Sequence, residues 1–287
     1  MERIWQPLGE VAPDQLVDAR LQLHHATQIA AAVGTSLAAP LADYSHTSLE
    51  WLAGPAVLAG GLIEGTPPFR AALRPADLML LLLDADERII ADDMLNGKTL
   101  ASGLDWMRRQ VGAFGADGAK VEPPSYQPGE FPSHPVGEGR TFELDPLAFA
   151  ELAHYYADAD LLLRDLAVRE PRASAVRCWP HHFDIATLIK LDDTEGEQAR
   201  TIGVGLSPGD AGYTEPYFYV TPWPYPEVSK LPPLPLGGWH TEGWVGAVLT
   251  ASALLAGDNE GQEQRASGFM AQAVAACQTL MGDTHHG

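Results

Sequence analysis

Cysteine and lysine are scarce in this sequence. Two cysteines, Cys178 and Cys277, are too few for a disulfide framework or, by themselves, for a zinc cluster. Only four lysines occur, and 18 Lys and Arg residues stand against 38 Asp and Glu residues, which gives a formal net charge of -20. A surface of this charge repels phosphate backbones and anionic lipid headgroups. We therefore expect no nucleic acid and no membrane among the partners.

Long apolar runs are also missing. The most apolar stretch, 78–83, lies between Asp77 and Asp84 and is far shorter than the ~20 residues that span a bilayer. The first ten residues, MERIWQPLGE, lack the basic stretch and the apolar run of a signal peptide. The sequence therefore predicts a cytoplasmic protein in which 78–83 is a buried strand.

Signatures of the common catalytic sites are absent. The sequence contains no Gly-x-Ser-x-Gly elbow, no Walker A loop, no Cys-x-x-Cys pair and no His-Glu-x-x-His. Gly203, Gly205 and Gly209 superficially resemble a dinucleotide fingerprint, but that motif must open into a helix, and here Pro216 leads into another strand. The segment predicts a hairpin loop instead, and the cofactor stays unknown.

Apolar spacing predicts helices that alternate with groups of short strands. Helices are expected at about 14–33, 99–114, 145–169, 244–256 and 262–281, followed by a frayed tail at 284–287. Strands are expected around 45–52, 56–63, 69–73, 78–84, 88–94, 176–191, 201–207 and 217–221. The order helix, antiparallel sheet, helix thus occurs twice. We predict an α+β fold of two similar units related by pseudo-twofold symmetry, plus a C-terminal helix.

A proline-rich segment separates the two predicted units. Residues 116–140 hold five prolines among glycines and charges, which is typical of a linker without regular structure. The predicted domains are a first α+β unit at 1–115 and a second at 145–287, joined by the linker 116–144.

The densest group of chemically suggestive residues is RCWPHHFD, residues 177–184. On a strand, alternation places His182 and Asp184 on one face, where the carboxylate would fix the histidine tautomer as a general base or metal ligand requires. We take this pair as the candidate catalytic residues; the alternative is that both hydrogen-bond within a half-buried sheet. His24 and His25, adjacent on the first helix, are interpreted as structural or solvated.

The first half of the sequence contains a similar pair of a histidine and a carboxylate, with weaker support. His46 and Glu50 also alternate onto one face of a predicted strand. A convergent set of His46, Glu50, His182 and Asp184 would suit a divalent metal such as zinc or iron. No short metal-ligand motif accompanies these residues, so the sequence assigns no metal site.

Aromatic residues gather in the second half. Tyr217 and Tyr219 point the same way on their predicted strand, Asp210 stands in the turn before it, and Trp239 and His240 follow. We take these five as candidate binding residues. So many aromatics among prolines are typical of a wall over a small-molecule pocket, or equally of packing that pins an irregular segment.

Several segments together resemble an uncharacterised bacterial family known only as a domain of unknown function. They are LHHATQIAAAVG and SHTSLEWL near the N-terminus, then WPHHFDIATLI, GLSPGD and EPYFYVTPWPYPE. They follow the family's order and span most of the chain, although His46 and Trp51 are spread out where the family has an adjacent pair. The family has no established activity, so the resemblance implies which residues cluster but no substrate.

The best interpretation of these patterns is a protein that binds a small organic molecule in a pocket between the two units. Acid–base chemistry by His182 and Asp184 would extend that function to catalysis. The alternative is a non-catalytic interaction or scaffold protein, which a homo-oligomer burying Trp223 and Trp239 would favour. A metal-dependent hydrolase is the third interpretation. The sequence leaves open whether the protein is an enzyme.

Overall fold

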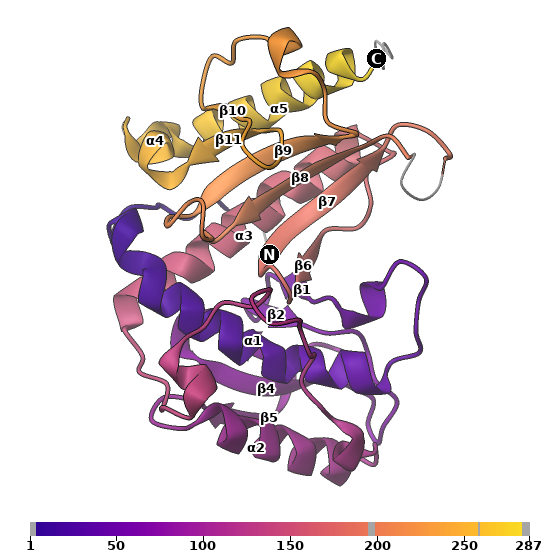
Figure 1. Cartoon of the computed structure of the whole chain (residues 1–287). Coiled ribbons are helices and arrows are strands. Elements are labelled where there is room, and N and C mark those ends of the chain that lie inside the picture. Colours follow the sequence, from indigo (N-terminus) through magenta and orange to yellow (C-terminus); the bar gives the residue numbers. More distant parts are fainter. Residues whose placement is uncertain (1–3, 195–198, 258, 283–287) are drawn as a thin grey trace. The chain divides into compact units, whose positions relative to one another are not determined.

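The computed structural model describes residues 4–194, 199–257 and 259–282 (Figure 1). The chain forms two compact units, each of which is described by itself. Unit 1 comprises Gln15–Ala157 and Arg177–Phe183, and unit 2 comprises Ile4–Asp14, Asp158–Val176 and the described residues from Asp184 onward. The tail expected at 284–287 lies outside the described residues. Within those residues, no helix combines the length and apolar character needed to cross a membrane.

An antiparallel sheet forms the centre of unit 1. Its strands pair in sequence order: β1 (Glu50–Leu52), β2 (Val57–Ala59), β3 (Phe69–Arg74), β4 (Met79–Asp84) and β5 (Ile89–Met94). Short connections join consecutive strands, so neighbours in sequence become neighbours in the sheet. Residues 80–83 of β4 are fully buried, so side chains on both faces of this strand are covered. The predicted buried strand is confirmed.

Two helices cover one face of this sheet, α1 (Val17–Leu37) and α2 (Leu100–Ala113) (Figure 1). The Thr99 side chain caps α2 by accepting a hydrogen bond from the Ser102 amide. Gly103 permits close packing, because a Cβ there would come within 2.9 Å of Ile29 on α1. The helices expected at 14–33 and 99–114 are therefore confirmed, with α1 beginning three residues later after a 3₁₀ turn.

The proline-rich segment 116–140 belongs to unit 1 and is fixed on α1. It contains two short 3₁₀ turns and otherwise irregular backbone, as its composition predicts. The Tyr126 hydroxyl donates to Gln28 Oε1 at 2.8 Å, and the Glu122 amide donates to Ser36 Oγ at 3.0 Å. The division into separate domains at 1–115 and 145–287 stays a prediction. Helix α3 (Pro146–Arg169) contributes its first half to unit 1 and its second half to unit 2.

Unit 2 also contains an antiparallel sheet, in which the strands pair in the order β10-β11-β9-β8-β7. Their bounds are β7 (Asp184–Lys190), β8 (Thr201–Ser207), β9 (Tyr217–Trp223), β10 (Gly238–His240) and β11 (Gly246–Thr250). Helix α5 (Gln262–Leu280) lies against β8, β9 and β11 (Figure 1). One face of the sheet is apolar and fully buried, with Ile185, Val204 and Val220 among its side chains. The predicted α+β class with a C-terminal helix is confirmed; the pseudo-twofold symmetry stays a prediction.

The helix predicted at 244–256 is wrong. Residues 246–250 form β11, between β10 and β9, and only the short helix α4 (Ala251–Leu255) follows, capped by Thr250. The run Val245–Leu249 is apolar almost throughout, and such a run fits a buried strand as well as a buried helix. Pairing with β10 on one edge and β9 on the other makes this run a strand, and Val248 and Leu249, on its opposite faces, are both buried.

The single strand predicted at 176–191 is also wrong. It is divided into β6 (Arg177–Trp179) and β7 by a turn at 180–183. Phe183 adopts a left-handed backbone with φ 57°, and its amide donates to Trp179 O at 2.7 Å. Side-chain alternation therefore does not continue through the turn, and it does not place His182 on the same face as Asp184.

Candidate functional site

The face of the second sheet opposite the apolar face is polar and aromatic. In register, Tyr219 of β9 lies between Gly205 of β8 and Val248 of β11, and Tyr217 lies opposite Ser207. Because side chains alternate along a strand, Tyr217 and Tyr219 share this face, as predicted. We call it the tyrosine face, defined by Asp184, Ser207, Tyr217, Tyr219 and Thr221.

Tyr219 reaches across the neighbouring strand to Asp184. Its hydroxyl donates to Asp184 Oδ2 at 2.5 Å. Gly205 lies beneath the phenol, and a Cβ at this position would come within 2.7 Å of the Tyr219 hydroxyl oxygen and of Ile185 O. The missing side chain at Gly205 is therefore what allows the ring to cross β8.

Tyr217 has its own carboxylate partner in the loop between β8 and β9. Its hydroxyl donates to Asp210 Oδ2 at 2.6 Å. Asp210 Oδ1 accepts from the amides of Gly212 at 2.7 Å and Tyr213 at 2.9 Å, which is an Asx turn. The turn residues predicted from sequence thus fix the carboxylate as well as the hairpin.

His240 ends this network. Its Nε2 lies 2.7 Å from Glu242 O, and its Nδ1 lies 3.0 Å from the Tyr213 hydroxyl. A carbonyl only accepts, so Nε2 carries the proton and, in the neutral ring, Nδ1 accepts from Tyr213. The ring also stacks on Trp244 with centroids 4.4 Å apart. Both nitrogens are occupied, so His240 offers no free base.

The rings form a continuous row. Ring centroids lie 6.2 Å apart for Tyr219 and Tyr217, 4.8 Å for Tyr217 and Tyr213, and 5.6 Å for Tyr213 and His240. These separations are those of aromatic pairs in contact. We call Tyr213, Tyr217, Tyr219, His240 and Trp244 the aromatic row. It joins three residues predicted from sequence to two others.

The phenols of the row stay protonated at neutral pH. Burial raises the pKa of Tyr219 well above its usual value, and the charge and hydrogen bond of Asp184 raise it further. Burial, followed by the hydrogen bond to Asp210, raises the pKa of Tyr217, and burial also raises the pKa of Tyr213. None of the three supplies a tyrosinate base, so the arrangement is suited to holding a ligand by hydrogen bonds and ring contacts.

Trp239 does not join this row, and its place in a ligand pocket stays a prediction. It pairs with Ala247, and Ala247 pairs with Val220, so alternation directs it to the apolar face. Its indole Nε1 donates to Pro232 O at 2.7 Å. The sequence could not show this, because the register of β10 is set by pairing with β11.

The predicted catalytic residues occupy different local environments. His182 is exposed in the turn before β7, and its ring stacks on His181 with centroids 4.4 Å apart. Asp184 begins β7 and accepts from Tyr219. Their pairing rested on an unbroken strand, which does not exist, and catalysis by this pair stays a prediction without a geometric basis.

The weak metal candidates are engaged in other interactions. His46 lies in a 3₁₀ turn rather than on a strand, and its Nδ1 accepts from the Leu41 amide at 3.1 Å. Glu50 forms an ion pair with Arg70 at 2.6 Å. Among the described residues, no three His, Cys, Asp or Glu side chains are grouped so that they could hold a metal ion.

A second polar cluster lies in unit 1, around His24 and His25 of α1. Both are buried, and His24 Nε2 lies 2.9 Å from Pro180 O and 3.0 Å from His181 O. Tyr126 stacks in parallel on Phe131 and on His181. The rings fill the space between α1 and the proline-rich segment, so the structural interpretation of the two histidines agrees with the packing.

Comparison with models of known protein families gave no match, and comparisons with curated proteins and with solved structures gave none either.

Proposed function

We propose that the protein binds a small organic molecule that carries a positively charged ammonium group, protonated or quaternary, on the tyrosine face. The proposal is supported above all by the environment of the Asp210 carboxylate. Its carboxylate is exposed and accepts hydrogen bonds from two amides and from Tyr217, and no lysine or arginine among the described residues pairs with it. A carboxylate held by neutral donors keeps its negative charge available for a ligand.

The aromatic row provides the second element of such a site. A cation over a tyrosine or tryptophan face gains roughly 0.5–2 kcal/mol, and aromatic cages recognise quaternary ammonium groups in this way. Tyr213 and Tyr217 are the rings next to Asp210. Lys190 lies on the same face of the sheet as Asp184. It is six residues farther along β7, roughly 20 Å from Asp184.

Binding fits the protonation states of this site better than catalysis does. The tyrosines keep their protons, and both nitrogens of His240 are occupied. A phenol that donates to a carboxylate becomes a better acceptor on its oxygen, so Tyr217 can receive an O–H or an N–H from the ligand. The site therefore selects for ligands with donors and positive charge.

The test compares choline with its neutral isostere, 3,3-dimethylbutan-1-ol, by isothermal titration calorimetry. We expect choline to bind with a Kd on the order of 1 mM and the neutral analogue about tenfold more weakly. Asp210→Asn removes the charge while keeping an acceptor, and should weaken choline binding about tenfold. Asp193→Asn, at an exposed aspartate of another hairpin, is the matched control and should change nothing.

Equal binding of choline and the neutral compound, or unchanged binding by Asp210→Asn, would show that charge plays no part and would overturn the proposal. Tyr217→Phe removes the hydroxyl and keeps the aromatic ring. If the hydroxyl accepts a hydrogen bond from the ligand, this variant should bind choline more weakly than the wild type does.

A second candidate function, docking to a second copy of the chain, is favoured by one specific observation. Trp223, Tyr225 and Val228 are 43%, 44% and 54% exposed, and the first two rings are in edge-to-face contact with centroids 5.0 Å apart. Trp223 is exposed, whereas Trp239 is half-buried, so Trp223 is the tryptophan better placed for such a contact. Sedimentation velocity over a range of concentrations decides it: a dimer lost in Trp223→Ser supports docking, and a monomer at all concentrations removes self-association.

A further inference from the structure

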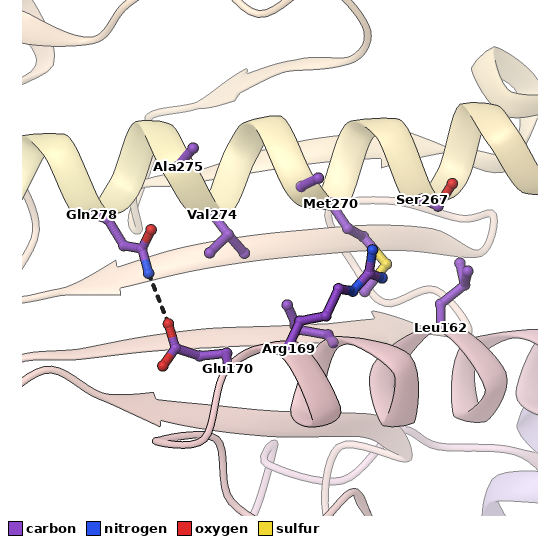
Figure 2. A pocket seen from close by; sticks show the side chains of 10 residues that line it. Leu162, Arg169, Glu170, Ser267, Met270, Val274, Ala275 and Gln278 are labelled. Carbon is purple, nitrogen blue, oxygen red and sulfur yellow. Dashed lines mark hydrogen bonds between the residues drawn. The ribbon is translucent and has the colours of Figure 1, made fainter. Parts of the chain in front are cut away.

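A cavity of about 210 Å³ lies between α3 and α5 in unit 2 (Figure 2). Its walls come from the second half of α3 and from the middle of α5. Leu162 and Leu166 face it from one helix and Met270 and Val274 from the other. It lies in the helical layer, away from the tyrosine face, so it is a separate site.

Small side chains on α5 explain why the space is open. Ser267, Ala271 and Ala275 recur at four-residue steps and therefore share one side of the helix. The leucines of α3 lie opposite them and do not fill the gap. Leu162, Met270 and Val274 are buried and form an apolar floor, while Ala271 and Ala275 are exposed at the rim.

The lining of the cavity includes an uncommitted positive charge, Arg169. Arg169 Nε donates to Asp165 O at 3.2 Å, which leaves the two terminal guanidinium nitrogens without a hydrogen-bond or ion-pair partner among the described residues. In Figure 2 the guanidinium extends over the groove beside Met270. Two N–H groups in a planar fork are the geometry that binds a carboxylate with two parallel hydrogen bonds.

A second charged residue of the lining, Glu170, has its charge satisfied by neighbouring side chains. Glu170 accepts from Gln278 Nε2 at 3.0 Å, drawn in Figure 2, and forms an ion pair with Arg172 at 2.9 Å. Arg169 is therefore the charged side chain of the lining that is left for a ligand, since Glu170 is paired with Arg172. At a salt concentration of about 0.15 M, charges of the acidic surface farther away than ~8 Å are largely screened.

We propose that this cavity binds a small monocarboxylic acid, with the carboxylate on Arg169 and an apolar body on the floor formed by Leu162, Met270 and Val274. An apolar cavity of ~150 Å³ is large enough to take up benzene. The larger cavity here holds a phenyl ring with a short side chain, or an alkyl chain of similar size. This binding site is independent of the ammonium site proposed on the tyrosine face, and either can fail without the other.

The experiment uses the full chain labelled with ¹³C at the methionine methyl groups, with phenylacetate as the probe. The Met270 resonance is assigned through Met270→Leu. We expect phenylacetate to shift it with a Kd on the order of 1 mM, and 2-phenylethanol, which lacks the carboxylate, to bind about tenfold more weakly.

Two variants test separately the contact with the carboxylate and the contact with the apolar part of the ligand. Arg169→Met keeps the apolar stem but loses the charge, and should weaken phenylacetate about tenfold while leaving 2-phenylethanol unchanged. Ala271→Leu, at an exposed position, should fill the groove and abolish both shifts. Arg109→Met, at an exposed arginine of α2, is the matched control and should bind as the wild type does.

An unmoved Met270 resonance at about 20 mM phenylacetate overturns the proposal. So does equal affinity of Arg169→Met and wild type, because the guanidinium would then have no role as head-group ligand. A thermal unfolding midpoint for Ala271→Leu near that of the wild type shows that the loss of binding in this variant is not a loss of fold.

Discussion

Lowering the pH from 7 to about 4 is expected to remove about 3 kcal/mol from the free energy of unfolding through one residue, His24. Burial in unit 1 lowers the pKa of His24 from 6.5 to about 4, and the hydrogen bonds to Pro180 O and His181 O offset this only in part. The side chain is 6% exposed, so solvent screens it little.

The direction follows from proton binding in the two states. Below pH 6.5 the unfolded chain protonates this histidine, while the folded chain does so only near pH 4. The unfolded state therefore binds more protons in this window, and stability is full above pH 6.5 and falls as the pH drops. Burial also lowers the pKa of His25, which adds to the loss in the same direction.

Urea unfolding at a series of pH values measures this effect. His24→Gln removes the titrating group, so its stability should vary less between pH 6.5 and 4, whatever its absolute value. His182→Gln, at an exposed histidine, should keep the wild-type slope. Parallel curves for His24→Gln and wild type would assign the acid sensitivity to carboxylates instead, and an NMR titration of the His24 ring locates its pKa directly.

Gly205→Ala is expected to destabilise the protein by about 1–3 kcal/mol and to disrupt the tyrosine face. The added Cβ would lie 2.7 Å from Ile185 O, 2.7 Å from the Tyr219 hydroxyl oxygen and 2.8 Å from the Ala186 Cβ. The first of these is backbone of the adjacent strand and cannot move without disturbing the β7–β8 pairing. The phenol must therefore leave its position on Asp184.

Gly238→Ala is the matched control, because a Cβ on this glycine of the edge strand β10 would meet nothing within 4 Å. Chemical unfolding reports the stability of both variants, and the proton resonance of the Tyr219 hydroxyl reports its hydrogen bond. If Gly205→Ala unfolded at the same midpoint as Gly238→Ala and kept that bond, the crowding at β8 would not be what positions Tyr219.

The candidate site could be predicted only in part from the sequence. Tyr217, Tyr219, Asp210 and His240 were identified as candidates, and the structure brings them into one network with Tyr213. Tyr213 and Trp244 carried no signal beyond being aromatic neighbours in sequence. The cavity between α3 and α5 was not predicted. Small side chains along one side of a helix indicate a cavity only when the helix that packs against them is known.

Local features were determined by the sequence itself. Apolar periodicity placed α1, α2, α3 and α5, and the Pro208–Asp210 turn predicted the hairpin between β8 and β9, because hydrogen bonds in a helix turn or a tight loop join residues close in the chain. The strands of the first sheet and strands β8 and β9 of the second were predicted from the same short-range signals, whereas β10 and β11 were not.

Only the tertiary structure decided which residues meet. Tyr219 and Asp184 are 35 residues apart, and their contact depends on the register of β7, β8 and β9 and on the glycine between them. The same register turned Trp239 toward the apolar face and made 246–250 a strand. Pairing and burial across a sheet depend on strands remote in the chain, so a one-residue difference in register reverses a side chain's face, and no local pattern records it.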